Sequence, residues 1–312
     1  MRLKYILLLS RPVNLIIVAV TMFITRYVVL KNILAKGGTY SLALSNLDFS
    51  SLVLSALLIT AAGNVINDYF DQRVDKINKP EKVIIGKNVN RKVAILVHQG
   101  LNVIAFALTL RVAILTSIWL LLLFPLAITF VLWWYSPIFK KKPLIGNLLI
   151  ALCTASVPVF AVITDLLLLR SSLLTQNVGS LTLSEHAWLW VLGIAAFAFV
   201  LTMIREAVKD AQDEPGDRAE RYQTIPILLG IRPTKRYVIA WIALYLCMVG
   251  WCMSRTASAT DMMWIVGCLT LPMLVALYYV LKANMPADFG KASRWIKIVM
   301  LGGLLLMLVL LY

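Results

Sequence analysis

Hydrophobic residues dominate long stretches of the chain, and short polar segments separate these stretches. An α-helix needs about 20 mostly apolar residues to cross a bilayer. Nine stretches meet this requirement: residues 12–30, 50–67, 93–110, 115–134, 144–166, 187–205, 237–254, 262–281 and 295–311. The pattern predicts an all-α integral membrane protein with nine transmembrane helices, in a single membrane domain over residues 1–312.

The composition supports this prediction. Of the 312 residues, 61% are hydrophobic and 14% are charged, whereas a soluble globular chain is about 45–50% apolar and about 25% charged. These values exclude a soluble enzyme, a disordered chain and a nucleic-acid-binding module. In a soluble protein the net charge of +15 would suggest nucleic acid. In a membrane protein its meaning depends on where the charges lie, and we expect no nucleic-acid partner.

The basic residues concentrate on one side of the predicted bundle. If the N-terminus is cytoplasmic, 24 of the 30 lysine and arginine residues fall in cytoplasmic segments. Cytoplasmic loops carry such an excess, so we expect a multi-pass protein of the inner (plasma) membrane with its C-terminus outside. Asp165, near the outer end of the fifth stretch, is expected to face the membrane interface.

The acidic residues are more informative, because ten of the fifteen fall in two cytoplasmic segments. In the first segment, Asn67, Asp71 and Asp75 are spaced four residues apart. If the helix continues past the membrane surface, they share one face, where like charges at this spacing destabilise each other. Oxygen-bearing side chains in such a row are typical ligands of a hard cation, and Mg²⁺ combines one or two carboxylates with substrate phosphates.

The second segment repeats part of this spacing, because Asp213 and Asp217 follow Asp71 and Asp75 at a common offset of 142 residues. The offset suggests loosely duplicated halves, about 1–143 and 144–312. Because Pro215 and Gly216 interrupt the second pair, we expect Asp213 to end one helix and Asp217 to begin a turn or the next helix. Asp210 could share the same face, which leaves the ligand set open.

Two acidic segments on one side of the membrane could together hold two Mg²⁺ ions and thereby a diphosphate. Cationic side chains around them would complement phosphate oxygens. The candidates are Lys79, Lys82, Lys140, Lys141, Lys142, Lys209, Arg218 and Arg221.

These residues resemble the two aspartate-rich motifs of the UbiA superfamily of intramembrane prenyltransferases. The first motif is similar to Asn67-Asp68-x-x-Asp71-x-x-x-Asp75 with Asn78-Lys79-Pro80 and Gly86. The second is similar to Lys209-Asp210-x-x-Asp213-x-x-Gly216-Asp217. Further similarity lies in Arg11-Pro12, in Tyr135-Ser136, in the run from Lys140 to Pro143 and in Gly146-Asn147. Many members have Arg where this chain has Lys79, and a lysine lacks the two-pronged geometry of arginine toward phosphate.

The resemblance implies a nine-helix UbiA-type bundle around a central cavity, a prenyl diphosphate as donor, a hydrophobic acceptor and membrane lipid as surroundings. It implies that Asp71, Asp75, Asp213 and Asp217 are catalytic and that they bind Mg²⁺ together with Asn67. It implies substrate contacts for Asn67, Asp68, Lys79, Lys82, Lys140, Lys141, Asn147, Lys209, Asp210 and Arg218. Within the superfamily, residues 67–80 and 288–297 look most like the geranylgeranylglyceryl phosphate prenyltransferase branch, which builds ether lipids.

Several alternatives remain at this point. The lysines at 140–142 either clamp an acceptor phosphate or are a positive-inside anchor, and Asn147 either donates to the substrate or packs helices together. Transfer to an aromatic acceptor, such as 4-hydroxybenzoate or a quinone precursor, is the alternative reaction. A transporter is the alternative class, although it would place ionisable residues near the middle of the membrane, where this chain has almost none.

Overall fold

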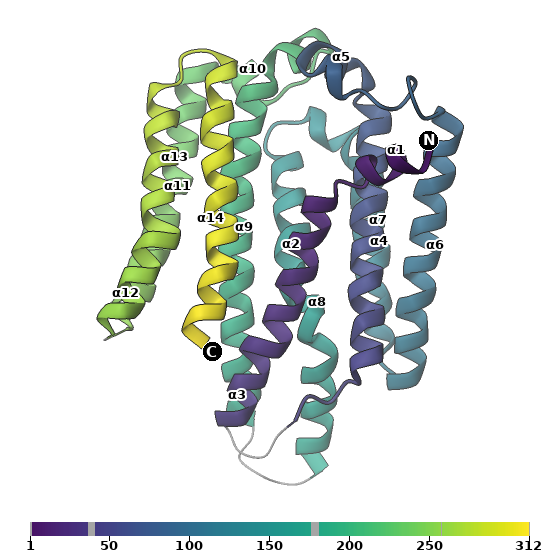
Figure 1. The fold of residues 1–312 in the computed structure, drawn as a ribbon, viewed down its shortest axis with the longest axis vertical. Helices are drawn as coiled ribbons and strands as arrows, with labels where there is room; N and C mark the ends of the chain where they lie inside the picture. The colour runs from purple at the N-terminus through teal and green to yellow at the C-terminus, as the bar shows by residue number, and fades with distance from the viewer. Residues whose placement is uncertain (1, 37–40, 176–180, 257, 312) are drawn as a thin grey trace. The chain divides into compact units, whose positions relative to one another are not determined.

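The computed structural model describes residues 2–36, 41–175, 181–256 and 258–311 (Figure 1). Its regular elements in these residues are helices, apart from one isolated bridge between Ile85 and Val89. The α-helices are α1 (Arg2–Leu9), α2 (Pro12–Phe23), α3 (Lys31–Lys36), α4 (Asn46–Phe70), α5 (Gln72–Asn78), α6 (Arg91–Thr116), α7 (Leu123–Tyr135), α8 (Ile145–Thr175), α9 (Leu181–Ala219), α10 (Ile225–Leu229), α11 (Ile231–Ser254), α12 (Ala259–Ile265), α13 (Leu271–Lys282) and α14 (Phe289–Leu311). Two π-helical turns, η1 (Ile24–Leu30) and η5 (Val266–Thr270), join α2 to α3 and α12 to α13. Short 3₁₀ turns are η2 (Pro80–Lys82), η3 (Trp119–Leu122), η4 (Phe139–Lys141) and η6 (Pro286–Asp288).

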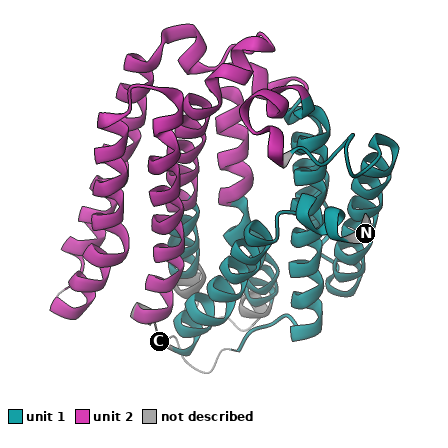
Figure 2. Ribbon diagram, turned by 45° about the horizontal axis from the view of Figure 1, so that its top comes forward, with its two compact units in different colours: residues 1–72, 82–136, 156–195 teal, residues 73–81, 137–155, 196–312 magenta. Residues whose placement is uncertain are grey.

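The chain divides into two compact units (Figure 2). Unit 1 comprises residues 1–72, 82–136 and 156–195, and unit 2 comprises residues 73–81, 137–155 and 196–312. The helices α8 and α9 each contribute one part to each unit. The boundary therefore differs from the division near residue 143 that the 142-residue offset suggests, and the duplication of the halves stays a prediction.

In unit 1, α4 packs along α6 and also contacts α1, α2 and α7. The core of this unit includes Met22, Phe49 and Leu52, which are fully buried. Phe124 of α7 stacks on Phe160 of α8 with ring centroids 3.8 Å apart. Aromatic and branched apolar side chains thus fill the space between these helices.

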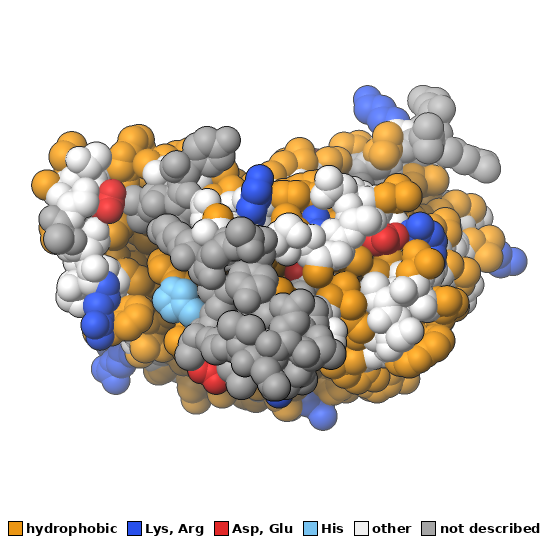
Figure 3. Space-filling model, turned by 90° about the horizontal axis from the view of Figure 1, so that it is seen from below, with side chains coloured by type: hydrophobic (Ala, Val, Ile, Leu, Met, Phe, Trp, Pro, Cys, Tyr) orange, Lys and Arg blue, Asp and Glu red, His pale blue; other side chains and the backbone are white. Residues whose placement is uncertain are grey.

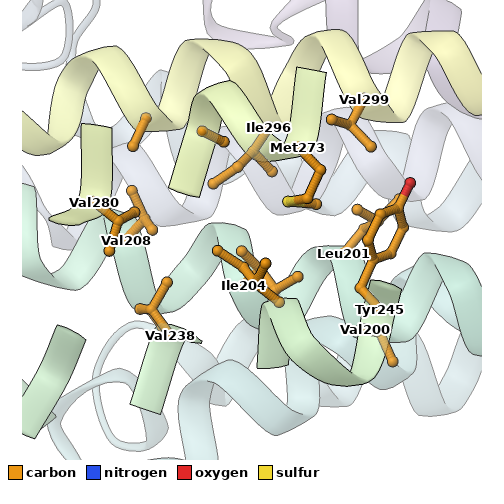
Figure 4. Close-up of a cluster of buried hydrophobic side chains, with 14 of the residues drawn as sticks. Val200, Leu201, Ile204, Val208, Val238, Tyr245, Met273, Val280, Ile296 and Val299 are labelled. Carbon is orange, nitrogen blue, oxygen red and sulfur yellow. The ribbon is translucent and has the colours of Figure 1, made fainter. Parts of the chain in front are cut away.

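In unit 2, the C-terminal part of α9 packs with α11, α13 and α14 around one apolar core (Figure 4). Ile204 of α9, Met273 of α13 and Ile296 of α14 point into this core and are completely buried. This packing supports the segment of α9 that continues into the acidic residues.

Eight helices in the described residues are long and apolar enough to cross a membrane, with mean hydropathies between 1.7 and 2.3. They correspond to eight of the nine predicted spans. The ninth, predicted at 115–134, is a shorter apolar helix over Trp119–Tyr135, so the count of nine is not confirmed. Large apolar side chains are exposed along these helices, and hydrophobic side chains also occupy much of the face in Figure 3. Exposed apolar surface of this extent suits lipid rather than water.

The structure corrects two expectations about helix ends. The helix of the first acidic segment does not continue through Asp75, because α4 ends at Phe70 and Asp71 is its C-cap, with φ −80° and ψ 3°. Aspartate is a weak helix former because its short side chain competes for main-chain hydrogen bonds. Conversely, α9 does not end at Asp213 and continues through Pro215 to Ala219.

Asp165 does not face the interface, which is a third correction. It is 2% exposed, and its Oδ2 lies 2.7 Å from Nε of Arg26, which is fully buried in the π-helical turn η1. Its Oδ1 accepts a hydrogen bond from the N–H of Leu44 at 2.8 Å. The guanidinium of Arg26 donates to the hydroxyl of Tyr27 and lies over the ring of Phe49. A buried charge is tolerated in this way only when it is paired and hydrogen-bonded.

We expect Asp165→Ala to destabilise the protein strongly, because it leaves the buried charge of Arg26 without its partner. Breaking a buried pair by removing one partner typically costs about 3–5 kcal/mol. The measurement is the thermal unfolding midpoint in detergent. The double variant Arg26→Met/Asp165→Leu should recover most of the loss.

The matched control for this prediction is Asp48→Ala. Asp48 pairs with Arg111, whose side chain is 45% exposed, and such surface pairs contribute about 0–1 kcal/mol. Equal unfolding midpoints for Asp165→Ala and wild type would contradict the prediction.

Candidate active site

One face of α9 in unit 2 carries four acidic residues: Glu206, Asp210, Asp213 and Asp217. Their spacing of four, three and four residues places them along a single helical face. Glu206 and Asp217 are 3% and 1% exposed, and the side chain of Asp213 is 15% exposed. A largely buried row of carboxylates is unfavourable unless cations or hydrogen-bond donors compensate it.

The chain supplies such cations and donors at the N-terminal end of this row, around Glu206 and Asp210. Oε1 of Glu206 lies 2.5 Å from Nη1 of Arg205, and Oε2 lies 3.9 Å from Nζ of Lys209. Asn147, in the first turns of α8 and 5% exposed, donates from Nδ2 to Oδ2 of Asp210 at 2.9 Å. The amide of Asn147 thus connects α8 to the acidic face of α9. A contact of Asn147 with substrate stays a prediction.

The last residue of α5 and the residue after it supply the compensation toward the C-terminal end of the row. Both belong to the first acidic segment. Nζ of Lys79 lies 2.6 Å from Oδ1 of Asp213. The side chain of Asn78 donates to the main-chain oxygen of Asp213 and accepts from the N–H of Gly216, each at 2.9 Å. Within unit 2, therefore, residues that follow the first aspartate-rich motif contact the second one directly.

The lysines of η4 approach the segment after α9. The ammonium groups of Lys140 and Lys141 lie 5.9 Å and 5.4 Å from the ring centroid of Tyr222. The carbonyl of Lys141 accepts a hydrogen bond from the N–H of Gln223 at 2.9 Å. These contacts place two cationic side chains near the C-terminal end of the acidic helix, while Lys142 is exposed.

The other half of the first motif lies in unit 1, at the end of α4. Oδ1 of Asn67 accepts a hydrogen bond from the hydroxyl of Ser136 at 2.9 Å. Asp68 forms an ion pair with Arg11 at 2.5 Å, which holds the end of α4 against the junction of α1 and α2. Asp71 is 2% exposed. The predicted first-motif ligands are thus divided between the units, because Asp75 lies in α5 of unit 2.

Mg²⁺ fits this donor set only together with a substrate. Among the described residues, no three His, Cys, Asp or Glu side chains gather closely enough to hold a metal ion by themselves. The acidic face of α9 nevertheless presents hard carboxylate oxygens, which are the ligands that Mg²⁺ prefers. Mg²⁺ usually binds through one or two carboxylates plus substrate phosphates rather than in an all-protein cage. The arrangement suits an ion that arrives with a diphosphate.

A model of the UbiA prenyltransferase family matches residues 13–311, which is nearly the whole chain. The chain belongs to the UbiA prenyltransferase family. It is therefore a membrane-embedded prenyltransferase rather than a transporter.

Known proteins agree with this assignment. The digeranylgeranylglyceryl phosphate synthase of Methanothermobacter thermautotrophicus is 31% identical over 304 residues, which cover 93% of this chain and 90% of that protein. A solved structure described as that of a digeranylgeranylglyceryl phosphate synthase covers 99% of this chain with a TM-score of 0.66 and 23% identity, and 98% of its own chain is covered. A UbiA homologue from Archaeoglobus fulgidus bound to DMAPP and Mg²⁺ has a TM-score of 0.50 and 17% identity and covers 98% of this chain and 99% of its own.

Two residues of this UbiA prenyltransferase were absent from the predicted site. Glu206 is one of the ten acidic residues in the two segments, and its spacing of four residues from Asp210 already indicates the same helical face. Asn78 was quoted as part of a motif, but nothing in the sequence indicated that its amide contacts Gly216. Long-range pairing of this kind becomes visible only in the structure.

The remaining predicted residues keep their assignments as predictions. The side chain of Arg218 is 61% exposed and pairs with Glu214 at 2.6 Å, so it lies toward solvent. Lys209 is partly buried beside Glu206. The side chain of Lys82 lies outside the described part of the chain.

For this prenyltransferase we expect Lys79→Gln to lower the rate of prenyl transfer at least about tenfold, because it removes the cation that contacts Asp213. The unfolding midpoint should change little, because a partly exposed ion pair contributes about 0–1 kcal/mol. The measurement pairs a transfer assay with thermal unfolding. Lys79→Arg should keep most activity, and Lys87→Gln, in an exposed turn, is the matched control. A wild-type rate for Lys79→Gln would refute a role for the pair.

Proposed function

We propose that this enzyme transfers a geranylgeranyl group from geranylgeranyl diphosphate to the hydroxyl of geranylgeranylglyceryl phosphate and releases diphosphate. The observation that carries the proposal is the acidic face of α9, with Lys79 on Asp213 and with Lys209 and Arg205 on Glu206. Carboxylates and cations alternate there at one end of a membrane helix. Such a surface complements a metal-bound diphosphate. The diphosphate oxygens can pair directly with the cationic side chains and can contact the carboxylates through the metal ion.

The digeranylgeranylglyceryl phosphate synthases among the relatives support the choice of acceptor. Geranylgeranylglyceryl phosphate carries a phosphate, and Lys140 and Lys141 are the cations that we assign to it. Both belong to unit 2, and Lys141 is exposed and available to a ligand.

We assign Asp71, Asp75, Asp213 and Asp217 to the diphosphate site, together with Asn67. When bound, Mg²⁺ supplies charge neutralisation on the departing diphosphate and orients it. Asn147 holds the carboxylate of Asp210 in a fixed orientation through its 2.9 Å hydrogen bond. Donors and charges that are already in place need no reorganisation during the reaction, which is the main source of electrostatic stabilisation in enzymes.

The reaction breaks the bond between the allylic carbon and the diphosphate oxygen. The acceptor oxygen then forms a bond to that carbon and loses its proton. Water would compete with the acceptor for the allylic cation, so the reaction benefits from an apolar enclosure. Ile204 and Val208 of α9 are completely buried in the core with α11, α13 and α14, so they exclude water from the side of the helix opposite its acidic face.

We also propose that the enzyme resides in the plasma membrane with its N-terminus and active-site residues on the cytoplasmic side. The basis is the concentration of 24 of the 30 basic residues on one side of the predicted spans. A water-soluble diphosphate headgroup would reach the acidic residues from that side.

The first test of the function is the loss of carboxylates. We expect Asp213→Asn and Asp71→Asn each to reduce Mg²⁺-dependent transfer of a radiolabelled prenyl chain by at least about a hundredfold, because each removes charge that holds the departing diphosphate. Asp261→Asn, near the start of α12, is the matched control and should retain wild-type activity. Near-normal transfer by either active-site variant would refute the proposed site.

The second test concerns the acceptor. Purified enzyme is given geranylgeranyl diphosphate, Mg²⁺ and one of four acceptors, namely geranylgeranylglyceryl phosphate, 4-hydroxybenzoate, a naphthoate or haem, and products are identified by mass. We expect a product with geranylgeranylglyceryl phosphate and release of diphosphate. A product only with an aromatic acceptor would refute the proposed substrate while leaving the prenyltransferase activity intact.

A further inference from the structure

The acidic face of α9 contains an unusual main-chain defect, because Pro215 lies inside the helix between Asp213 and Asp217. Proline has no N–H and normally breaks or kinks a helix, at a cost of about 3 kcal/mol or more. Here the helix continues to Ala219, and the N–H of Tyr222 still reaches the carbonyl of Asp217 at 2.9 Å. The turn around the proline also receives hydrogen bonds from outside the helix.

These bonds come from the side-chain amide of Asn78, the last residue of α5. Its Nδ2 donates to the carbonyl of Asp213, and its Oδ1 accepts from the N–H of Gly216, both at 2.9 Å. The carbonyl that Pro215 leaves without its helix donor is that of Ala211, so the two bonds from Asn78 are made in addition to the helix. A primary amide offers the same donor and acceptor as a peptide group, so Asn78 bonds to both main-chain groups that flank the proline.

Gly216 is shaped to receive this amide. A Cβ atom at this position would lie 2.5 Å from Nδ2 of Asn78 and 2.8 Å from its Oδ1. A Cβ atom does not approach other side-chain atoms this closely, so any side chain at residue 216 would displace the amide. Gly216 is itself buried, so removing Asn78 would take a hydrogen-bond acceptor from a buried N–H.

The adjacent residue adds a third contact, since Lys79 pairs with Oδ1 of Asp213. The end of α5 thus holds both the main chain and the side chain of Asp213. All of these residues lie in unit 2, and none of the three contacts requires a ligand.

We propose that Asn78 is a positioning residue, which fixes Asp213 and Asp217 for catalysis by hydrogen-bonding the main chain on both sides of Pro215. The proposal rests on the function proposed above, in which both carboxylates serve the diphosphate. Asn78 does not touch substrate in this account. It acts by holding two carboxylates of one helical turn in the geometry that the diphosphate needs, because small displacements of such groups reduce catalysis strongly.

The test uses the full-length enzyme in detergent, with Asn78→Ala, Asn78→Asp and Gly216→Ala. Asn78→Asp keeps an acceptor for Gly216 but turns a carboxylate oxygen toward the carbonyl of Asp213. We expect each variant to lower kcat at least about tenfold, while the KM for geranylgeranylglyceryl phosphate stays within about twofold. Asn284→Ala, an exposed asparagine in the same unit, is the control and should match wild type.

A second readout does not depend on turnover. Geranylgeranyl diphosphate with Mg²⁺ should raise the thermal unfolding midpoint of the wild type. In Asn78→Ala this ligand-induced shift should be reduced by half or more, because the variant binds the ligand more weakly. A residue that serves stability alone would lower the midpoint with and without ligand equally. An unchanged ligand-induced shift together with an unchanged kcat in Asn78→Ala would overturn the proposal.

The double variant Asn78→Ala/Gly216→Ala tests whether the two residues act together. Because the Cβ at residue 216 collides only with the amide of Asn78 among the atoms nearest to it, Gly216→Ala should have little further effect on kcat once Asn78 is alanine. Multiplicative losses in the double variant would contradict the proposal.

Asp213→Asn separates a failure of this inference from a failure of the proposed function. If Asp213→Asn abolishes transfer and the ligand-induced shift while Asn78→Ala keeps both, the positioning role is wrong and the function stands. If Asp213→Asn also keeps both, the proposed site itself is wrong, and the positioning role falls with it.

Discussion

Polar and charged groups inside a membrane protein must find their partners within the protein, because hydrocarbon offers none. This constraint explains the contacts on which both units depend. In unit 1, Arg26 and Asp165 neutralise each other, and the remaining oxygen of Asp165 holds the main chain of Leu44. In unit 2, the side chains of Asn78, Lys79 and Asn147 compensate the acidic face of α9.

The same constraint connects structure to chemistry. A largely buried row of carboxylates destabilises the folded state unless it is compensated. In this chain, cations and amide donors surround the row. Those partners also leave the carboxylates ordered and close to positive charge, which is the state that a diphosphate with its metal ions requires. The proposed diphosphate site therefore lies on a helix segment that would be unfavourable if its partners were removed.

The hydrophobic pattern was sufficient to predict the fold class, because runs of about 20 apolar residues have one common solution in a bilayer. It was less reliable at helix ends. Asp71 ends α4 although the spacing of Asn67, Asp71 and Asp75 favoured a continuous helix. The sequence predicts that Pro215 interrupts α9, but the helix continues across it. Asn78, 135 residues before Asp213, hydrogen-bonds the main chain at this point. Local rules fail at such points because the deciding partner is distant in the sequence.

The acidic residues of the proposed site are conspicuous in the sequence, because ten of the fifteen acids fall in two segments of a very apolar chain, and their role stays a prediction. Their partners are less conspicuous. Asp165 has no distinguishing neighbour in the sequence, and only the structure shows that Arg26 covers it. Glu206 and Asn78 lie beside predicted site residues, but their contacts depend on side-chain geometry, which residue spacing alone does not specify.

We propose that carboxylates of both aspartate-rich motifs hold the diphosphate through divalent metal ions. The most direct measurement is anomalous diffraction from crystals grown with Mn²⁺ in place of Mg²⁺ and with a non-reactive thio analogue of geranylgeranyl diphosphate. We expect one Mn²⁺ between the diphosphate oxygens and the carboxylate of Asp213 or Asp217. We expect another between the diphosphate oxygens and the carboxylate of Asp71 or Asp75. A bound diphosphate without Mn²⁺ at these carboxylates would contradict the proposal.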